Sequence, residues 1–276
     1  MSNHKLKNRI KKIKRGFLIW RILILLLVNL WLDNLIFKIF RTNRDKKNKV
    51  QIKRAKWFTN QLIELGSAFI KIGQLLSARP DLIPNTWIQE LSKLQDQVPQ
   101  FSYTKVEEII QKELGHKFSE INQITSTPIG SASLAQVHKA TLKDGKEVVF
   151  KVQRPNLKNL FTIDLNIMQQ IAFIIQKNKN WSRGRNWVAI AKECRKVLMK
   201  ELDFKCEAQY AARFRQQFLD DENVEVPEVI WNLSTEKVLC LSYLEGTKIS
   251  DVEKLKSKNI DLSKIAEIGA VSYLKQ

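Results

Sequence analysis

Cysteine is scarce in this chain of 276 residues, which contains only Cys194, Cys206 and Cys240. No two of them form a Cys-x-x-Cys motif, and none lies in metal-ligand spacing with a histidine. A small, odd and scattered set of cysteines indicates a reducing compartment and argues against a disulfide framework or a structural zinc site. We therefore expect the cysteines to be small, partly buried side chains.

Acidic residues are nearly absent from the first part of the chain. Residues 1–56 contain 17 Lys or Arg but only two acids, Asp33 and Asp45, so this segment carries +15 of the net charge of +19. The rest of the chain is close to balanced. Such a basic segment predicts an anionic partner surface, either lipid headgroups or nucleic acid.

A long uninterrupted apolar run is also missing near the N-terminus. The longest run, Ile22–Val28, is far shorter than the roughly 20 residues that cross a bilayer. No small-residue cleavage site of a signal peptide follows it. The segment predicts a helix in the membrane interface, with Trp20 and Trp31 near the headgroups. A helix packed on its own domain is an equal alternative, and a spanning helix ranks below both.

Glycine and proline are sparse, with 9 and 6 residues. Residues 41–50 have few apolar side chains and indicate a linker, and the pattern from there to about residue 125 is helical. Apolar residues spaced by threes and fours from Phe58 to Leu76 predict one continuous helix. Two shorter helices are expected to end at Pro99 and at Gly115.

The pattern changes to strands after residue 125. Asp144-Gly145 lies between two strand-like runs and predicts a β-hairpin whose second strand carries Lys151. The remaining elements are predicted as helices over 160–178 and 186–218, strands over 224–229 and 237–243, and a closing helix over 260–276.

A lysine in the middle of a strand, one hairpin after a turn of small residues, is typical of a phosphate site. The turn is Gly130-Ser131-Ala132-Ser133, where a backbone can approach phosphates closely, and the Lys151 ammonium can neutralise their charge. The segment KELDFKCEAQY offers Glu201, Asp203 and Glu207 as carboxylates to hold that lysine. In a continuous helix Asp203 and Glu207 share a face, with Glu201 about 120° away. Taken one at a time, each feature has a plainer interpretation. The small-residue turn is typical of an ordinary turn, the strand lysine of a charge at a sheet edge, and the acids of a solvated helix face.

Six segments in order resemble the UbiB/ABC1/AarF family of atypical kinases across residues 57–276. They are AFIKIGQLLSARPDLIP with the KxGQ residues Lys71, Gly73 and Gln74, then ELSKLQDQVP, PIGSASLAQVHKA, VVFKVQRP, ELDFKCEA with the ExD residues Glu201 and Asp203, and VLCLSYLEGTKI. The resemblance implies an α+β fold, a protein-kinase-like N-lobe of a small antiparallel sheet plus helices, with a helical N-terminal extension and no C-lobe. It divides the chain into three parts. Residues 1–50 would form a membrane-interface segment and linker, and residues 51–125 the helical extension. Residues 126–276 would form the N-lobe, the hinge and the first C-lobe helix.

The resemblance also implies ATP as the cofactor. The cofactor-binding residues would be the loop Gly130, Ser131, Ala132 and Ser133, the lysine Lys151 with its partner Glu207, and the hinge residues Tyr243, Leu244 and Glu245. Regulatory residues would be Lys71, Gly73, Gln74, Glu201 and Asp203, with Lys71 and Gln74 folded over the nucleotide pocket. The implied role is isoprenoid quinone or lipid biosynthesis at a membrane. The implied partners are a lipid surface, quinone-biosynthesis proteins and, as a further alternative, a second copy of the chain, in the cytoplasm and peripheral to the membrane.

The chain departs from this family at three places, one of which is Tyr210, where many bacterial members have Asn. Phe150 replaces a smaller residue before the lysine and is expected to crowd the adenine site. The family's HxDxHPGN catalytic loop and metal-binding Asp are absent, because no His-x-Asp sequence precedes Gln276. The Mg²⁺ ligands are therefore missing, and no turnover is expected from this chain alone.

These features leave three functional hypotheses. The first is a truncated ATP-binding member of the family, and the second is a non-catalytic membrane adaptor. Nucleic-acid binding ranks last, because the basic segment has no aromatic stacking platform; no nucleic-acid partner is expected.

Overall fold

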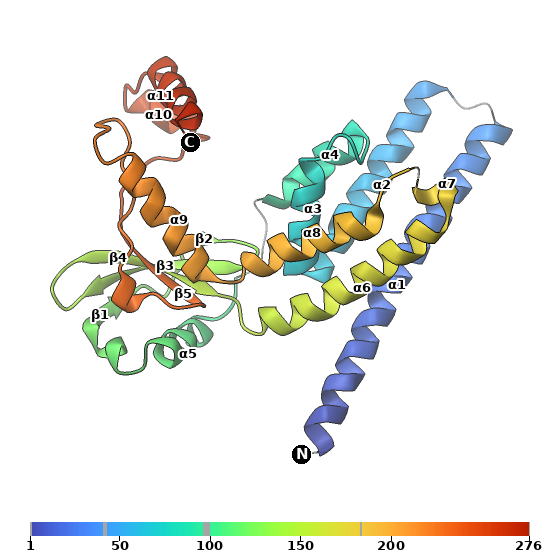
Figure 1. Ribbon diagram of the computed structural model, residues 1–276. Helices are drawn as coiled ribbons and strands as arrows, with labels where there is room; N and C mark the ends of the chain where they lie inside the picture. Colours follow the sequence, from blue (N-terminus) through green and yellow to red (C-terminus); the bar gives the residue numbers. More distant parts are fainter. Residues whose placement is uncertain (1, 41–42, 96–99, 183, 276) are drawn as a thin grey trace. The chain divides into compact units, whose positions relative to one another are not determined.

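The computed structural model describes residues 2–40, 43–95, 100–182 and 184–275, which divide into two compact units (Figure 1). The helical unit comprises Met1–Lys105, Gly130–Gln136 and Gln153–Leu202. The sheet unit comprises Val106–Ile129, Val137–Val152 and Asp203–Gln276. The predicted α+β fold class is confirmed by these helices and the small antiparallel sheet.

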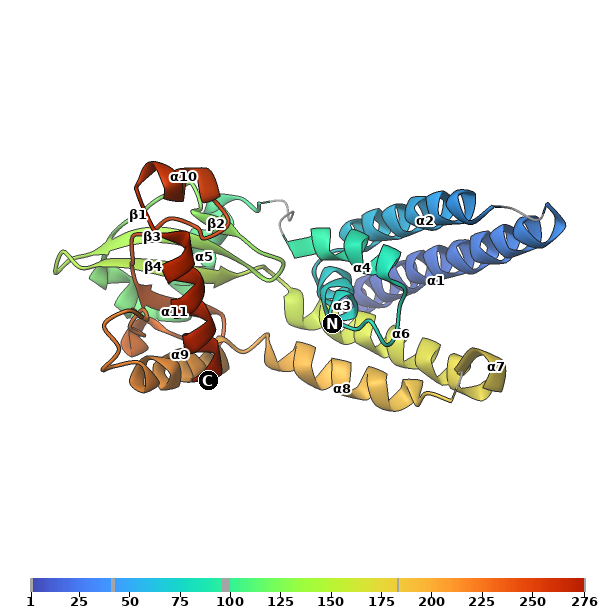
Figure 2. The same cartoon turned by 90° about the horizontal axis from the view of Figure 1, so that it is seen from above.

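The helical unit is built from amphipathic helices around one apolar core. Its elements are α1 (Ser2–Ile39), α2 (Arg44–Leu65), α3 (Ser67–Ser77), α4 (Asn85–Leu91), the 3-10 turn η1 (Ser92–Gln95), the short strand β2 (Gly130–Ser131), α6 (Leu157–Lys177), α7 (Lys179–Ser182) and α8 (Trp187–Lys200). Figure 2 shows α6 and α8 side by side. The core includes the fully buried side chains of Ile70, Leu91, Phe161 and Leu198.

The sheet unit contains most of a sheet with the strand order β1-β3-β4-β5. Its elements, some of which begin or end in the helical unit, are α5 (Tyr103–Leu114), the 3-10 turn η2 (Gly115–Glu120), β1 (Ile121–Ile124), β3 (Ala135–Leu142), β4 (Glu147–Gln153), α9 (Phe204–Gln217), η3 (Trp231–Leu233), β5 (Val238–Ser242), α10 (Val252–Ser257) and α11 (Leu262–Leu274). β4 and β5 pair antiparallel, with Phe150 opposite Cys240 and Lys151 opposite Leu239.

The predicted hairpin at Asp144-Gly145 is confirmed as the connection between β3 and β4. Gly145 has φ +85°, a left-handed conformation that favours glycine, and its N–H donates to Leu142 O at 3.0 Å. The Asp144 carboxylate accepts from Lys146 N at 3.0 Å. The turn therefore fixes the register of the strand that carries Lys151.

Two helices predicted as continuous are broken in the structure. Gly66 has φ +87° and ends α2, and its N–H donates to Leu62 O, so the predicted helix from Phe58 to Leu76 is two helices. The predicted helix over 186–218 is also wrong, because it is α8 and α9. Asp203 is the N-cap of α9, and its carboxylate accepts a hydrogen bond from Lys205 N at 3.0 Å. This bond satisfies a backbone amide in the first turn, which has no partner within the helix.

Two further predictions of local structure are corrected. Among the described residues of the predicted linker 41–50, those from Arg44 onward belong to α2, because lysine and asparagine are compatible with a solvated helix. The predicted strand over 224–229 is reduced to a single bridge between Val229 and Leu241, while the strand predicted over 237–243 is confirmed as β5.

Helix α1 is longer and more continuously apolar than the run Ile22–Val28 indicated. Its segment Lys12–Ile39 is long and apolar enough to cross a membrane by length and composition. Asp33, which interrupts the apolar sequence of this helix, is paired with Arg54 of α2 through hydrogen bonds of 2.7 and 3.0 Å.

One stripe of α1 packs on the helical unit, and another is exposed. Ile19 and Ile22 are buried in the unit's core, and Leu26 is also buried. The outer face of α1 is defined by its exposed large apolar side chains: Ile13, Phe17, Ile24, Leu25, Leu27, Val28, Trp31, Leu32, Leu35, Ile36 and Ile39. This face has the composition of a membrane-contacting surface.

Candidate functional site

Lys151 lies in the middle of β4, on a face different from that of its apolar neighbours. Val148, Phe150 and Val152 are completely buried, whereas Val149 and Lys151 are partly exposed. Successive side chains of a strand point to opposite faces. Phe150 was expected to crowd the adenine site, but its side chain lies in the core and not on the face that carries Lys151. Val149 shares that face with Lys151.

The ammonium of Lys151 is held by two residues of α9. Its Nζ lies 2.5 Å from Oε1 of Glu207 and 5.2 Å from the centroid of the Phe204 ring. Glu207 is in the first turn of α9, where the helix dipole favours a negative charge. The predicted partner of Lys151 is thus confirmed. The side chains retain 27% and 43% of their exposure, so the pair is still accessible to a ligand.

The predicted hinge follows β5 directly. The Tyr243 N–H donates to Glu147 O at 3.1 Å, and the Lys139 ammonium lies 4.0 Å from the centroid of the Tyr243 ring. Tyr243 therefore has no backbone donor left for adenine. In the described part of the chain, the backbones of Leu244 and Glu245 form no hydrogen bond, so their donors and acceptors are available.

The small-residue loop belongs to the helical unit. Gly130 and Ser131 form β2, and the Ala132 N–H donates to Ala135 O at 2.8 Å to close the turn. Ser133 is buried. The guanidinium of Arg154 also bonds to this loop. The role of the loop in phosphate binding stays a prediction.

The KxGQ residues make contacts inside the helical unit. Lys71 Nζ lies 2.7 Å from Oε2 of Glu201, an oxygen that is enclosed by protein and has no hydrogen bond of normal geometry. Gln74 donates to Leu94 O at 2.9 Å. Lys71 and Glu201 are therefore brought together, while the expected position of Lys71 and Gln74 over a nucleotide stays a prediction.

Gly73 is required by close packing within the same motif. A Cβ at this position would lie 2.3 Å from Leu94 Cδ1 and 2.9 Å from Leu62 Cδ1. A larger residue would therefore require these two leucine side chains or α3 itself to shift within a packed core.

The ExD residues do not share one helix as expected. Glu201 is the C-cap of α8, and Asp203 is the N-cap of α9, so the two predicted acidic faces do not exist. Asp203 accepts from Lys205 N and lies 3.8 Å from the Cys206 thiol. Its observed role is to start the helix that carries Glu207.

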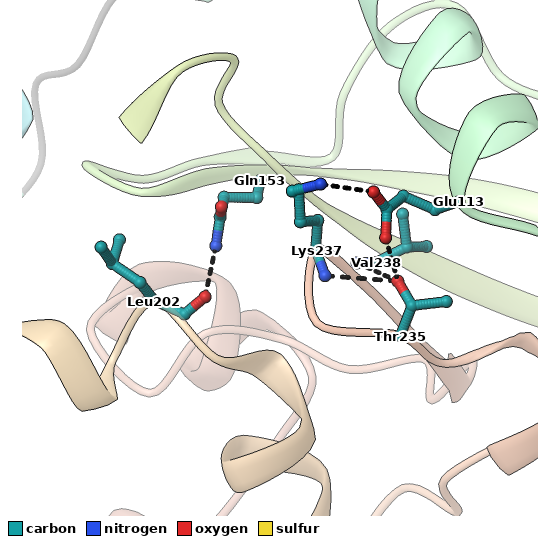
Figure 3. A network of polar contacts seen from close by, with 6 residues as sticks. All are labelled: Glu113, Gln153, Leu202, Thr235, Lys237 and Val238. Carbon is teal, nitrogen blue, oxygen red and sulfur yellow. Dashed lines mark hydrogen bonds and ion pairs between the residues drawn. The ribbon is translucent and has the colours of Figure 1, made fainter. Parts of the chain in front are cut away.

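Figure 3 shows two sets of polar contacts that were not predicted from the sequence, one within each unit. In the helical unit the Gln153 side chain donates to Leu202 O at 2.7 Å. In the sheet unit Glu113 of α5 accepts from Lys237 at 2.6 Å and from Thr235 at 3.0 Å, just before β5. The only sequence signal was the polar character of these residues beside apolar strands.

The helical unit also contains an apolar cavity of about 630 Å³ between α3, α6 and α8. Its lining includes Ile72, Leu76, Ile171, Ala172, Ile190 and Cys194. Burial, reinforced by the charge of Glu201, raises the pKa of the Cys194 thiol, so this cysteine behaves as an apolar wall residue.

Among residues 2–40, 43–95, 100–182 and 184–275, no group of three His, Cys, Asp or Glu side chains could hold a metal ion.

Comparison with known proteins gives a consistent result. A family model described as the ABC1 atypical kinase-like domain matches residues 93–276. The chain is 40% identical over 266 residues to Protein ACTIVITY OF BC1 COMPLEX KINASE 7, chloroplastic, of Arabidopsis thaliana, covering 96% of this chain and 38% of the relative. It is 34% identical over 273 residues to Probable protein kinase UbiB of Cellvibrio japonicus, covering 97% of this chain and 48% of the relative.

A solved structure is also similar. The structure of the Rv3197-erythromycin complex from Mycobacterium tuberculosis aligns with a TM-score of 0.51 and 29% identity, over 76% of this chain and 53% of that one. The chain spans less than half the length of both curated relatives.

Proposed function

The chain belongs to the ABC1 atypical kinase-like family, and on this premise we propose that it binds ATP at the face of β4 that carries Lys151. The observation that carries the proposal is the contact between Lys151 and Glu207. In protein kinases a strand lysine held by a helix glutamate neutralises nucleotide phosphates. The same charge arrangement is present here, on strand β4 and helix α9.

The hinge supports the adenine end of this proposal. The free backbone groups of Leu244 and Glu245 offer donors and acceptors in a segment without regular structure. The edge of adenine carries complementary groups, so two backbone hydrogen bonds would orient the base. Tyr243 contributes no backbone donor, because Glu147 O already accepts it.

We propose no phosphoryl transfer by these 276 residues alone. Bound Mg²⁺ would offset the phosphate charge, but no metal-ligand cluster is present among the described residues. The sequence also has no His-x-Asp motif to supply a catalytic base. What the residues present can do is bind and orient a nucleotide.

The lipid part of the proposal rests on two features of the helical unit. The outer face of α1 would lie in the interface of a membrane, because the opposite stripe of the helix already packs on its own unit. Basic residues of α1 and α2 would meet anionic headgroups. The apolar cavity would take the hydrocarbon chain of a lipid or isoprenoid, since most of the residues in its wall are apolar.

The ATP proposal is tested by isothermal titration calorimetry of the full chain in detergent micelles. Lys151→Ala is expected to weaken ATP binding about tenfold or more, because a charge-assisted contact with phosphate contributes about 1.5–3 kcal/mol. The matched control is Lys146→Ala in the same hairpin, which removes an exposed ion pair with Glu228 at 2.9 Å. Equal ATP affinity of the wild type and Lys151→Ala would refute the proposal, as would absence of ATP binding by the wild type.

The membrane proposal is tested by co-sedimentation with vesicles that contain phosphatidylglycerol. Phe17→Ser with Trp31→Ser should reduce binding strongly, since full burial of each aromatic contributes about 2 kcal/mol. Trp181→Ser, which removes a 56% exposed aromatic from α7, is the control. Sedimentation that is unchanged by the double substitution would exclude the outer face of α1.

A non-catalytic adaptor is the second candidate function. It is favoured by the exposed outer face of α1. In that case vesicle binding would persist and weaken with salt, and Lys151→Ala would leave the biological function intact.

A further inference from the structure

The apolar cavity of the helical unit lies along two antiparallel helices, α3 and α8, whose ends differ in their chemistry. At one end Lys71 Nζ lies 2.7 Å from Glu201 Oε2, and neither residue lines the cavity. At the other end, beyond α3 and just before α8, Arg185 Nη2 donates to Asp81 O at 2.5 Å. The lining reaches this second end at Arg79, whose side chain is half exposed. The cavity is therefore apolar along its walls and cationic where it reaches solvent.

Two guanidinium groups share one carboxylate at this end. Arg79 donates to both oxygens of Asp81, through Nε at 2.8 Å and through Nη2 at 2.7 Å. These hydrogen bonds, together with the charges of Arg79 and Arg185, hold the pKa of the Asp81 carboxyl below its usual value. Among the described residues of the lining, Glu193 is also charged, and its carboxylate lies 3.8 Å from Lys196 Nζ. Two cations and one anion thus leave a charge of +1 beside the end of the cavity.

Trp187 lines the cavity at the same end, two residues after Arg185. Its indole Nε1 donates to Ser182 O at 3.2 Å, and its backbone N–H donates to Gln176 Oε1 at 2.8 Å. These polar groups are satisfied within the protein, so the ring contributes apolar surface to the wall. Such a ring is typical of a boundary between apolar and polar surroundings.

This arrangement matches an amphiphile better than a plain hydrocarbon. A cavity of about 630 Å³ with apolar walls suits a hydrocarbon chain. An excess positive charge at one end favours an anionic headgroup there. Guanidinium groups bind phosphate through paired, charge-assisted hydrogen bonds, and two of them lie within reach of one carboxylate.

We propose that this cavity binds a single-chain lipid phosphate, with the chain between α3, α6 and α8 and the phosphate on Arg79 and Arg185. This inference rests on the lipid part of the proposed function, because the chain occupies the same cavity. It adds the class of the headgroup, its position and two arginines outside the predicted set of site residues.

The first experiment compares farnesyl monophosphate, farnesol and inorganic phosphate as competitors of a fluorescent isoprenoid-chain probe. The full chain is held in the same detergent micelles for every variant, so partition of the competitors into micelles cancels. Arg185→Gln should weaken farnesyl monophosphate about tenfold and leave farnesol unchanged, because it removes one charge-assisted contact with the phosphate. The control is Arg195→Gln in α8, which removes a guanidinium bond of 2.8 Å to Asn166 and should change neither affinity.

Two results of this comparison would overturn the inference. An equal loss for farnesol would mean that Arg185 only supports the fold of the cavity. Displacement of the probe by inorganic phosphate as effectively as by farnesyl monophosphate would mean that the chain is not recognised.

The second experiment uses the carboxylate that competes with the ligand. Asp81→Asn should strengthen farnesyl monophosphate severalfold and leave farnesol unchanged, because both guanidinium groups lose a competing anion. Arg79→Gln should weaken the same ligand about tenfold, and Arg79→Lys should restore part of the loss because it keeps the charge. A gain of affinity on substitution is not expected from loss of structure, so an unchanged or weakened affinity in Asp81→Asn would overturn the inference.

The outcomes separate this inference from the proposed function. If farnesol displaces the probe from the wild type as well as farnesyl monophosphate does, the headgroup site fails and the proposed lipid cavity stands. If neither compound displaces the probe, both fail. Ile171→Trp, which fills the cavity, should abolish binding of both compounds, and farnesyl monophosphate that still binds this variant would overturn the inference.

Discussion

The Lys151 ammonium lies 2.5 Å from Glu207 Oε1, and this contact joins the middle of β4 to the first turn of α9. In the sequence the two residues are separated by three helices, α6, α7 and α8, that belong to the helical unit. The chain therefore leaves the sheet unit after the lysine and returns to it at Asp203, the cap of the helix that supplies the glutamate.

Glu207→Gln is expected to weaken ATP binding about tenfold, since the lysine loses the carboxylate that holds it toward phosphate. The free energy of unfolding should change by less than about 1 kcal/mol, because the pair is partly exposed. Calorimetric titration and urea denaturation measure the two quantities. Glu228→Gln, which breaks the exposed Lys146 pair, is the control, and an equal effect of both substitutions on ATP affinity would contradict the prediction.

Gly73→Ala is expected to destabilise the helical unit by about 1–3 kcal/mol, through overpacking of a methyl group against Leu94 and Leu62. Urea denaturation followed by circular dichroism measures this loss. Gly269→Ala in α11 is the matched control, because no atom lies within 4 Å of the added Cβ. That control should be neutral or gain up to about 1 kcal/mol from helix propensity. Equal stability of the Gly73→Ala variant and the wild type would show that α3 can shift freely.

His138 should make the stability of the sheet unit fall in mild acid. Burial lowers the pKa of this fully buried histidine below 6.5, opposed by the hydrogen bond from Nδ1 to Thr125 O at 2.8 Å. Below pH 6.5 the unfolded chain binds a proton that the folded chain does not, so stability is lost as the pH falls from 6.5 to the lowered folded pKa.

The slope of this loss reaches at most about 1.4 kcal/mol per pH unit. It is measured by urea denaturation between pH 7 and 5, with His138→Gln as the comparison, since glutamine can still donate to Thr125 O without titrating. Parallel pH profiles of the wild type and His138→Gln would contradict the prediction.

Ile171→Trp should fill the apolar cavity and abolish binding of a fluorescent isoprenoid-chain probe, with little effect on ATP affinity. The matched control is Ile174→Trp on the same helix, at a position that is 44% exposed and outside the cavity lining. Fluorescence titration measures the dissociation constants. If the probe still binds the Ile171→Trp variant but no longer binds Phe17→Ser with Trp31→Ser, the hydrocarbon chain binds outside the cavity.

The candidate site could be predicted in part because its residues lie in segments with strong local constraints. Asp144-Gly145 fixes a hairpin, and the alternation of Val148, Phe150 and Val152 fixes which face carries Lys151. The break at Gly66 was not predictable from spacing, because apolar residues continue by threes and fours across it. Gly66 has a φ of +87°, a left-handed backbone conformation that the spacing of apolar residues does not predict.

Contacts between distant residues could not be predicted for a different reason. Thr235 and Lys237 meet Glu113 across more than 120 positions of sequence. Arg15 forms hydrogen bonds of 2.8 Å with Asp164, also a distant residue. A charged side chain in a basic segment has many alternative partners in the sequence, and only packing of the helices selects one.

The sequence by itself determined the segregation of positive charge, the hairpin, the strand that carries Lys151 and its family. These follow from composition and from short-range rules of backbone geometry. Only the tertiary structure decided that Arg154 bonds to the small-residue loop, that Asp203 separates two helices and which stripe of α1 stays exposed. The physical reason is that these features depend on which distant surfaces exclude water together, and a linear pattern does not specify that.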